Sequence, residues 1–519
     1  MAITQNTETH ITSINPATLE VLGRVKISSL EEIDATVAKA QSAFAKWRHV
    51  PIKERLNYIA QFKRYVFANR EAIATVIARE TGKPLSEALV AEIFGVLETC
   101  DWIQKNARRL LRDKPVKLNS LFLPGKRAFN VYEPLGVIAV ISPFNFPFSI
   151  PVSSMLAALV AGNTVVLKAS PKTALVAETI VKAFAAVGFP AGVIGIVQGD
   201  RAEAERLINS DVNRIMFTGS VAAGRAIAGM AAKKLIPCTL ELGGKHAAIV
   251  LDDCDLDKIG PPLIWAAFTN AGQACASIER LYVVKSIAGA LEEKLASLAG
   301  SLSMGDPLSP ETSVGPLIDE SQLGRVRALL DDAIAGGARV LTGGQERRDH
   351  GGYFFAPTVV AGVTQSMRLV QDEIFGPVLP IIEVDDEREA VKLANESNLA
   401  LAASVWSRDL KRAEMVARQL NAGMVWINDG LYTHISPDAP WGGAKDSGYG
   451  RMHSAAELLD LVHIKNIGIN QQSTQEWNFP YSAQSLEYVR GGIEVCHGAI
   501  SERIAGAQRV VRYLLGKLR

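Results

Sequence analysis

One cysteine near the middle of the chain has surroundings that would let a substrate reach its sulfur. In the stretch FTNAGQACASIERLYV, Cys275 has small neighbours on both sides, including Ala274 and Ala276. The thiolate is the nucleophilic form of cysteine, and it needs access as well as loss of its proton. Taken alone, Cys275 is either such a nucleophile or a buried structural cysteine, as the apolar surroundings of Cys100 and Cys238 suggest for those two residues.

Two other polar residues have positions suited to acid–base and oxyanion chemistry. Glu241, in TLELGGKHAAIVLDD, ends a short apolar run before a Gly-Gly turn. A carboxylate in an apolar setting has a raised pKa and can act as a general base. Asn145, in ISPFNFPFSIP, lies in a proline-bracketed turn where its amide could donate to a developing oxyanion. The ordinary alternatives are a solvated glutamate at a strand end and a turn asparagine.

Two features suit a ligand that carries phosphate. In FTGSVAAGRAI a strand runs through Gly219 and Gly224 into a helix, whose N-terminus could face a phosphate. No Lys-Ser/Thr follows this pair, and G-x-G-x-x-G is absent, so the motif by itself is weak. Lys168 ends the apolar strand VVLK, at the edge where ligands collect in open α/β sheets, although a surface lysine is the simpler interpretation.

The elements around these residues predict an α/β fold. Residues 30–112 have apolar side chains at helical spacing, with Ser29 as a plausible N-cap and Gly82 ending one helix. Val137–Ile141 reads as a buried strand, after which strands alternate with helices near 173–187 and 201–209. A second alternating region spans 286–445. Such alternation is typical of parallel sheets covered by helices.

Length and composition exclude several classes of protein. A chain of 519 residues needs at least two domains. A net charge of +1 gives no indication of nucleic-acid binding. Five cysteines without metal-ligand spacing predict neither a disulfide framework nor a metal site, and they favour a reducing compartment. The first ten residues lack signal-peptide features and no long apolar run occurs, so we expect a cytoplasmic protein.

The motifs gain their meaning in combination. In this order, FNFP, LK, FTGS…G, LELGGK, NAGQACAS, EIFGPV and PWGGAKDSGYGR resemble the aldehyde dehydrogenase superfamily, of the NAD(P)-dependent, non-acylating Cys/Glu type. The resemblance covers roughly residues 12–470, and the separation 275 − 241 = 34 between cysteine and glutamate matches as well. It implies a Rossmann-like cofactor domain (1–115 and 135–243), an α/β catalytic domain (244–445) and a small β oligomerisation arm (116–134 and 461–470). A homodimer or homotetramer follows.

The resemblance also implies roles for individual residues. Cys275 is the nucleophile, Glu241 the general base, and Asn145 forms the oxyanion hole with the backbone N–H of Cys275. The implied cofactor-binding residues are Ser142, Phe144, Lys168, Pro171, Gly199, Thr218, Gly219, Ser220, Gly224, Leu242, Glu373 and Phe375. The implied substrate tunnel comprises Ile150, Ser153, Ala274, Ala276 and Ile278. No metal is implied.

The cofactor position departs from the family pattern. NAD-preferring relatives often carry a glutamate three residues after the lysine, where this chain has Pro171. Without that carboxylate nothing there repels a 2′-phosphate, and the adjacent Lys172 could attract one. Both NAD and NADP therefore remain open as the cofactor.

The expected substrate is an apolar aldehyde, because the implied tunnel residues are small or apolar and include no arginine for a distal carboxylate. The acid is the expected product, since Glu241 can activate water for hydrolysis of a thioester. The alternatives are a semialdehyde such as succinate semialdehyde, an acyl-transferring reductase, which typically lacks this glutamate, and a non-catalytic structural or binding member of the superfamily, which would lack Cys275 or Glu241.

A C-terminal extension, 471–519, lies beyond the family pattern. Its end, SERIAGAQRVVRYLLGKLR, predicts an amphipathic helix with Ser501 as its cap. One face carries Ile504, Ala507, Val511, Leu514, Leu515 and Leu518, and the rest of the surface carries Arg503, Arg509, Arg512, Lys517 and Arg519. Basic amphipathic helices can lie on membranes. Docking of 500–519 on the protein itself or on a neighbouring subunit is the simpler interpretation.

Overall fold

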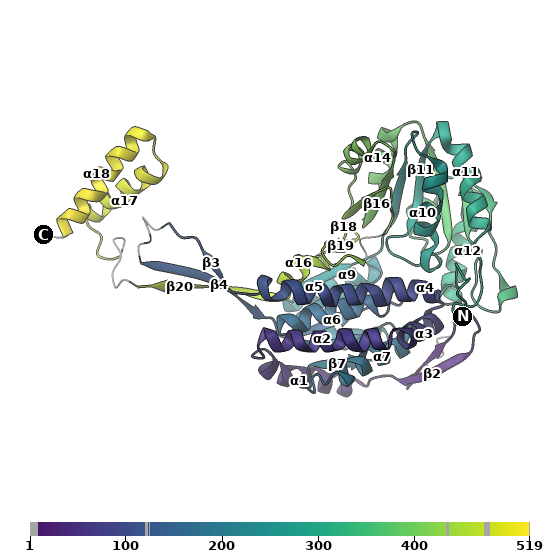
Figure 1. Cartoon of the computed structure of the whole chain (residues 1–519), viewed down its shortest axis with the longest axis horizontal. Helices are drawn as coiled ribbons and strands as arrows, with labels where there is room; N and C mark the ends of the chain where they lie inside the picture. Colours follow the sequence, from purple (N-terminus) through teal and green to yellow (C-terminus); the bar gives the residue numbers. More distant parts are fainter. Residues whose placement is uncertain (1–8, 120–122, 124, 432–434, 472–477, 518–519) are drawn as a thin grey trace. The chain divides into compact units, whose positions relative to one another are not determined.

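The computed structural model describes residues 9–119, 123, 125–431, 435–471 and 478–517 (Figure 1). Two compact units make up the chain. The first contains the described residues up to Leu110 together with Pro134–Val462, and the second combines Leu111–Glu133 with His463–Arg519. The predicted cofactor and catalytic parts therefore share one unit, while the predicted arm and C-terminal extension share the other.

The N-terminal helices follow the predicted pattern. They are α1 Leu30–Trp47, α2 Ile52–Ala68, α3 Arg70–Thr81, α4 Leu85–Glu87, the π-helical turn η1 Ala88–Phe94 and α5 Gly95–Leu110. Ser29 caps α1 in a capping box with Glu32, which supplies partners to two backbone N–H groups at the helix start. Gly82 ends α3 in the left-handed conformation that glycine adopts without strain, with φ of 78°.

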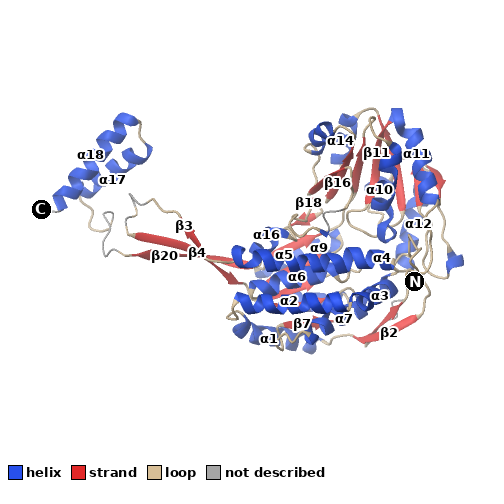
Figure 2. Ribbon diagram, viewed as in Figure 1, coloured by secondary structure: helices blue, strands red, loops and turns tan. Residues whose placement is uncertain are grey.

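A six-stranded sheet forms the first layer of the larger unit (Figure 2). Its order is β19-β9-β8-β5-β6-β7, and all neighbours except β19 run parallel. The strands are β5 Val137–Ile141, β6 Thr164–Lys168, β7 Ile194–Val197, β8 Arg214–Thr218, β9 Cys238–Glu241 and β19 Gly448–Tyr449. The intervening helices are α6 Ser149–Ala161, α7 Ala174–Ala186, α8 Arg201–Asn209 and α9 Val221–Lys234. This is the predicted strand–helix alternation.

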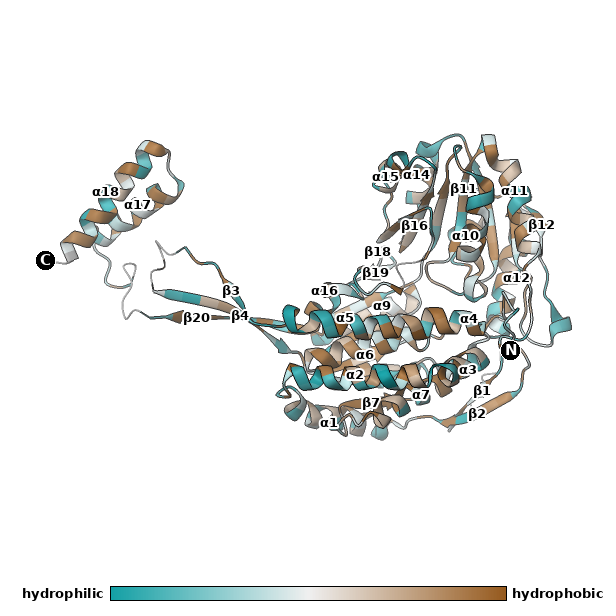
Figure 3. Cartoon of the chain, viewed as in Figure 1, coloured by the Kyte–Doolittle hydropathy of each residue, from teal (hydrophilic) through white to brown (hydrophobic). Residues whose placement is uncertain are grey.

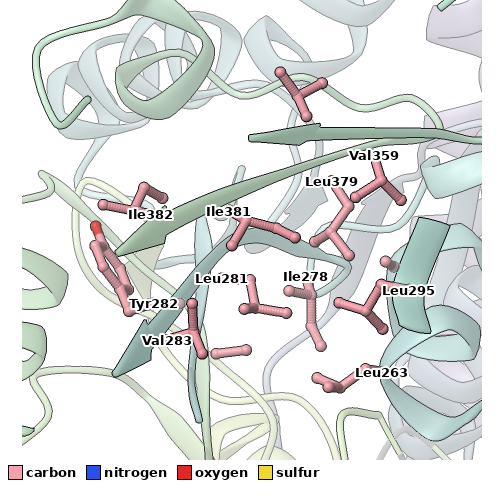
Figure 4. Packing of buried hydrophobic residues seen from close by; sticks show 14 of the residues in the cluster. Leu263, Ile278, Leu281, Tyr282, Val283, Leu295, Val359, Leu379, Ile381 and Ile382 are labelled. Carbon is pink, nitrogen blue, oxygen red and sulfur yellow. The ribbon is translucent and has the colours of Figure 1, made fainter. Parts of the chain in front are cut away.

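A seven-stranded sheet forms the second layer, in the order β12-β13-β14-β11-β10-β16-β17. Its strands are β10 His246–Val250, β11 Ile278–Val284, β12 Arg339–Thr342, β13 Thr358–Ala361, β14 Val378–Val384, β16 Ala402–Trp406 and β17 Met424–Ile427. The helices are α10 Leu256–Phe268, α11 Lys285–Gly300, α12 Glu320–Ala335, α13 Arg368–Gln371, α14 Glu387–Asn395 and α15 Leu410–Ala417. Buried aliphatic side chains from β11 and β14 pack against α10 and α11 (Figure 4).

Short elements complete the larger unit. They are the antiparallel pair β1 His10–Ile14 and β2 Val21–Lys26, the pair β15 Leu399–Ala400 and β18 Ala444–Lys445, and the helix α16 Ser454–Asp460. β19 and α16 follow the strands of the second sheet in the sequence. Because β19 pairs with β9, this late part of the chain returns to the first sheet.

The smaller unit holds a three-stranded sheet and a helical hairpin. The sheet has the order β20-β4-β3, with β3 Lys114–Val116, β4 Lys126–Pro134 and β20 Val462–Asn470. Val462–Asn470 is an edge strand of this sheet, and most of its side chains are exposed. The hairpin consists of α17 Ala483–His497 and α18 Ile500–Lys517.

The helix start at the C-terminal end differs from the prediction. α18 begins at Ile500, so Ser501 lies inside the helix and does not cap it. The backbone N–H of Ala499 instead donates to the Glu502 carboxylate at 2.7 Å, and this bond fixes the entry into the helix. Among the described residues, no helix combines the length and apolarity needed to cross a membrane.

Candidate active site

Cys275 lies where two cavities of the larger unit meet. One is a long cleft along the carboxyl ends of the first sheet, and the other is a tunnel on the opposite side of the thiol. Four residues line both cavities: Thr218, Glu241, Leu242 and Cys275. A group bound in the cleft and a group bound in the tunnel would therefore meet at the cysteine, with Glu241 beside them.

The strand ends explain how distant residues converge on the cleft. β5, β6, β8 and β9 run parallel, and the register pairs Ile141 with Lys168 and Thr218 with Glu241. Carboxyl ends of parallel strands meet at one edge of the sheet. The strand order reverses around β5, since β6 and β7 lie on one side of it and β8 and β9 on the other. That switch point is where open α/β sheets bind their ligands.

An unusual backbone presents the nucleophile. The turn η3 Thr269–Gly272 contains three consecutive residues with positive φ, namely Asn270 (54°), Ala271 (53°) and Gly272 (71°). A Cβ on Gly272 would lie 2.3 Å from the backbone oxygen of Gly376, so only glycine fits there. Non-glycine residues in this conformation are strained and are held by their surroundings.

Burial raises the pKa of both Cys275 and Glu241. Burial, followed by the nearby carboxylates of Glu373 and Glu241, raises the pKa of the Cys275 thiol to about 12. Burial likewise raises the pKa of Glu241 well above its usual value. Neither carboxylate oxygen of Glu241 has a hydrogen-bond partner within the described residues. A buried carboxyl group without partners is free to hold a water or to take up a proton.

Asn145 belongs to a hydrogen-bond network that connects it to the turn preceding Cys275. Its Nδ2 donates to the backbone oxygen of Gln273 at 3.0 Å. Nδ2 of Asn270 donates at 3.1 Å both to that oxygen and to the backbone oxygen of Asn145. The backbone N–H of Asn270 in turn donates to the Glu87 carboxylate at 2.7 Å. These bonds hold the amide of Asn145 close to the turn that carries Cys275.

A fully buried ion pair lies behind Asn145. The side chains of Lys83 and Glu92 are both 0% exposed, and the ammonium donates to the Glu92 carboxylate. Nζ of Lys83 also donates to the backbone oxygen of Asn145 at 2.8 Å and lies 4.0 Å from the centre of the Phe146 ring. The other oxygen of Glu92 accepts from the backbone N–H groups of Phe148 and Ser149 at 3.1 and 2.8 Å. Together they clamp the turn from Asn145 to Ser149.

This ion pair predicts a large loss of stability when one partner is removed. We expect Lys83→Met to lower the free energy of unfolding by about 3–5 kcal/mol, because it leaves the Glu92 carboxylate buried and unpaired. The matched control is Lys63→Met, which removes a lysine paired with Asp101 at the surface. For the control we expect a loss below about 1 kcal/mol. Denaturant titrations of the two variants measure the difference, and equal losses would contradict the role given to Lys83.

The cleft has the features that a dinucleotide requires. Ser220 caps α9, so the N-terminus of that helix lies at the cleft next to Thr218 and Gly219, where N–H groups can receive phosphate oxygens. Lys168 is 5% exposed and its ammonium donates no hydrogen bond within the described residues. Burial lowers the pKa of Lys168 to about 8. A buried cation without a partner fits the hydroxyl groups of a ribose.

Glu373 and Phe375 stand at the inner end of the cleft on a firmly held loop. The Glu373 carboxylate accepts from the backbone N–H of Gly244 at 3.0 Å, and burial raises its pKa to about 7. The Glu279 carboxylate accepts from the N–H groups of Ile374 and Phe375, both at 2.8 Å. Lys245 donates to Glu279 at 2.9 Å in a second buried pair. The loop therefore has a fixed shape.

Most of the implied cofactor residues line this cleft. Ser142, Phe144, Lys168, Pro171, Thr218, Gly219, Ser220, Leu242, Glu373 and Phe375 are all there. Gly199 and Gly224 are not among its lining residues. Gly199 has φ of 149° at the turn before α8, and Gly224 packs against the Leu242 side chain, where a Cβ would come within 2.5 Å. Both glycines shape the walls of the cleft from behind.

Lys172 does not face the cleft, contrary to the suggestion that it attracts a 2′-phosphate. Its Nζ pairs with the Asp319 carboxylate at 2.5 Å and lies 4.9 Å from the Phe144 ring centre. Arg201, the first residue of α8, lines the cleft instead. Sequence reasoning missed Arg201 because a lone surface arginine after a turn carries no local signature.

Two residues of α12 were also missed. Gln322 donates from Nε2 to the backbone oxygens of Ile374 and Phe375 at 3.1 and 2.8 Å. Arg325 donates to the backbone oxygen of Glu373 at 2.6 Å. Both side chains line the cleft and hold the loop of Glu373 and Phe375. In the sequence, Gln322 and Arg325 look like polar residues on an ordinary surface helix. Their role can be recognised only once the position of the loop of Glu373 and Phe375 is known.

The tunnel beyond Cys275 is lined by apolar side chains. They include Val90, Phe146, Ile150, Trp265, Ala274, Ala276, Leu401, Leu431, Ile435, Trp441 and Met452. Of the implied tunnel residues, Ile150, Ala274 and Ala276 line it. Ser153 lines a smaller neighbouring cavity with Ile150, and Ile278 packs in the core of the second sheet because it begins β11 (Figure 4). The described lining includes neither arginine nor lysine.

Within the described residues, no group of three or more His, Cys, Asp or Glu side chains is arranged to hold a metal ion. All five cysteines are free thiols.

The fold and the site define an α/β oxidoreductase with a dinucleotide cleft that ends at a cysteine. Comparison with known proteins agrees, because the pattern of the aldehyde dehydrogenase family matches residues 3–467. The chain belongs to the aldehyde dehydrogenase family, and it is an NAD(P)-dependent aldehyde dehydrogenase.

Several relatives are similar over nearly their whole length. The chain is 37% identical to 4,4'-diapolycopene aldehyde oxidase of Methylomonas sp. over 492 residues, which cover 94% of this chain and 92% of that protein. It is 35% identical to glutarate-semialdehyde dehydrogenase of Pseudomonas putida, covering 88% of this chain and 93% of the relative. Among solved structures, the NAD+ complex of an aldehyde dehydrogenase from Bacillus cereus superposes with a TM-score of 0.84 at 33% identity, covering 89% and 94% of the two chains.

Proposed function

We propose that this enzyme oxidises a long, apolar aldehyde to the carboxylic acid through a covalent intermediate on Cys275. The Cys275 sulfur attacks the carbonyl carbon and forms a thiohemiacetal, whose oxyanion receives hydrogen bonds from Nδ2 of Asn145 and the backbone N–H of Cys275. A preorganised donor of this kind contributes roughly 3–4 kcal/mol to the stabilisation of a transition state. NAD(P)+, when bound in the cleft, supplies the hydride acceptor.

Glu241 completes the cycle by activating water against the thioester on Cys275. Its raised pKa makes it a stronger base than an exposed glutamate, and its unpartnered oxygens leave room for that water. In its ionised form the same carboxylate can first accept the thiol proton, which is needed because the resting Cys275 thiol has a pKa of about 12. It must pass that proton to solvent before it can accept a second one from water. Hydrolysis then releases the acid and restores the thiol.

The single observation that carries the substrate proposal is the apolar tunnel. Its walls present mainly aliphatic and aromatic side chains, and its described lining includes His453 but no arginine or lysine for a distal carboxylate. Val90 and Trp265 are 52% and 49% exposed, so apolar surface continues to the solvent. Burying alkyl or polyene carbon there contributes about 0.8 kcal/mol for each CH2 group, which favours long chains over short ones.

The relatives support this proposal to different degrees. The name 4,4'-diapolycopene aldehyde oxidase describes an enzyme for a polyene aldehyde, which is an apolar substrate. Glutarate-semialdehyde dehydrogenase acts on a substrate with a carboxylate at its far end. A carboxylate in this tunnel would have to lose its hydration, and the described lining offers it no arginine or lysine as a partner. We therefore favour the apolar aldehyde over the semialdehyde.

An aldehyde panel tests the substrate class. We expect kcat/KM to rise by at least about tenfold between a four-carbon and a ten-carbon aliphatic aldehyde, since six more CH2 groups enter the tunnel. Succinate semialdehyde serves as the comparison, and Cys275→Ala serves as the control that removes all cofactor reduction. A higher kcat/KM for succinate semialdehyde than for the ten-carbon aldehyde would overturn the proposal.

The pKa of Glu241 predicts the pH dependence of turnover. Because burial raises that pKa, the carboxylate is protonated at acidic pH and the rate of thioester hydrolysis should increase as the pH rises through it. Glu241→Gln should lower kcat by about 100-fold or more, abolish this increase and let the acyl-enzyme accumulate. Rapid-quench mass spectrometry detects the acyl group. A normal turnover rate in this variant would be incompatible with a general-base role.

We propose that the cofactor site accepts NADP as well as NAD. Pro171 lines the cleft where a carboxylate would repel a 2′-phosphate, and Arg201, which pairs with Glu205 at 2.7 Å, lines the cleft as well. Pro171→Glu should raise KM for NADP by about tenfold or more through repulsion and leave KM for NAD within about twofold. The new glutamate begins a helical turn, where a negative charge is tolerated. Equal changes in the two constants would refute the proposed contact.

We further propose that the enzyme is a homodimer or homotetramer. β20 is an edge strand with exposed backbone and side chains, and such edges are normally covered by another chain.

A further inference from the structure

The C-terminal hairpin is held together by its own contacts. α17 and α18 approach closely at Gly491 and Gly506, where a Cβ on either residue would lie within 2.7 Å of the other's backbone oxygen. The rings of Tyr488 and Tyr513 pack 4.9 Å apart across the same interface. Arg509 of α18 pairs with Glu487 of α17 at 2.7 Å. One face of α18 is therefore covered by α17.

A second face of α18 is apolar and uncovered. This face, called the apolar stripe below, consists of Ile500, Ile504, Val511, Leu514 and Leu515, which are between 48% and 80% exposed. At 3.6 residues per turn, the five positions fall within about 100° of arc, some 120° away from the buried positions 506 and 510. The stripe therefore runs along the helix on a side that α17 does not cover. Figure 3 shows hydrophobic positions, in brown, at intervals along α18.

The charges next to the apolar stripe are positive. α18 carries Glu502 as its one acidic residue against four basic ones, Arg503, Arg509, Arg512 and Lys517. Arg509 is neutralised by the carboxylates of α17. Arg503 and Arg512 are exposed, lie on opposite sides of the stripe, and form no ion pair with any described carboxylate. An exposed stripe between two unpaired arginines has the pattern of a helix that lies in a lipid interface.

Aromatic side chains add to the exposed apolar surface of the hairpin segment. Phe479 and Tyr481, just before α17, are 82% and 70% exposed, and their ring centres are 4.6 Å apart. Exposed aromatic rings of this kind favour the headgroup region of a bilayer, where one side is apolar and the other is wet.

We propose that the apolar stripe of α18 docks on the surface of a membrane that contains anionic lipid. The aliphatic side chains enter the boundary between headgroups and acyl chains, while Arg503 and Arg512 contact lipid phosphates. A second copy of this chain fits the stripe less well, because a symmetric pairing of two such helices would bring the unpaired arginines of both copies together.

Membrane docking would bring the enzyme to its substrate, a step that rests on the proposed function. A long apolar aldehyde partitions into the bilayer and is scarce in water. An enzyme that lies on that surface meets the aldehyde where its concentration is highest. The docking itself depends only on the hairpin, so it can be tested without any substrate.

Vesicle flotation of the full-length enzyme tests the proposal. One set of vesicles is pure phosphatidylcholine and the other contains about one third phosphatidylglycerol. We expect the enzyme to float with the anionic vesicles. The double variant Val511→Glu/Leu514→Glu should lower the bound fraction by at least about tenfold, and Arg503→Glu/Arg512→Glu should remove the preference for anionic lipid.

Two controls keep the outcome interpretable. Leu410→Glu/Met415→Glu replaces two residues on α15 that are each 62% exposed, and it should float like the unaltered enzyme. Oxidation of a short, water-soluble aldehyde verifies that each variant is folded. The proposal is overturned if the unaltered enzyme floats with neither vesicle, or if the stripe variant floats as well as the α15 variant. A change of oligomeric mass in the stripe variant without loss of flotation assigns the stripe to a contact between copies and also overturns it. Flotation without oxidation of apolar aldehydes would reject the proposed substrate alone.

Discussion

The buried pair of Lys83 and Glu92 connects the helical layer of this enzyme to its chemistry. Two charges without solvent exposure are costly unless every donor and acceptor finds a partner. Here the Lys83 ammonium group donates to Glu92 and to the backbone oxygen of Asn145, and the Glu92 carboxylate accepts from two N–H groups at the start of α6. The turn that carries Asn145 is thereby fixed from behind. The hydrogen bonds of Asn270 connect this turn to the one that carries Cys275. The geometry of the proposed oxyanion site therefore depends on the Lys83–Glu92 pair, although neither residue lines the site.

The same exclusion of water sets the chemical state of the site. Burial raises the pKa of Cys275 and of Glu241, because an uncharged thiol and an uncharged carboxyl group cost less to bury than their anions. A resting thiolate would be a better nucleophile, but the nearby carboxylates of Glu373 and Glu241 disfavour a negative charge on the sulfur. In the proposed mechanism, the thiol of Cys275 gives its proton to the ionised carboxylate of Glu241 as the sulfur attacks the carbonyl carbon.

The sequence allows prediction of those parts of the site that carry their own local signature. Lys168, Thr218 and Glu241 each end an apolar strand, and parallel pairing brings such ends together. The residues that hold them could not be predicted in this way. Lys83 bonds to a residue 62 positions away and Asn145 to one 128 positions away, and neither pairing leaves a pattern in one sequence. The converse holds for three residues of recognised motifs, Gly199, Gly224 and Ile278. They contact the packing behind the site and do not line it. A motif identifies a segment of the chain but not the direction in which each of its residues points.

The tunnel and the helix α18 share one physical property, which is exposed apolar surface. The tunnel is apolar at its walls and at its exposed residues Val90 and Trp265, and α18 exposes an apolar stripe on a separate unit of the fold. Exposed apolar surface is costly in water, and contiguous patches of it usually mark a site of interaction. The dinucleotide cleft shares only Thr218, Glu241, Leu242 and Cys275 with the tunnel, so cofactor binding does not explain the apolar tunnel walls. The poorly soluble aldehyde that we propose would account for both surfaces, because it would fill the tunnel through the burial of carbon and reside in the lipid phase that attracts a basic amphipathic helix.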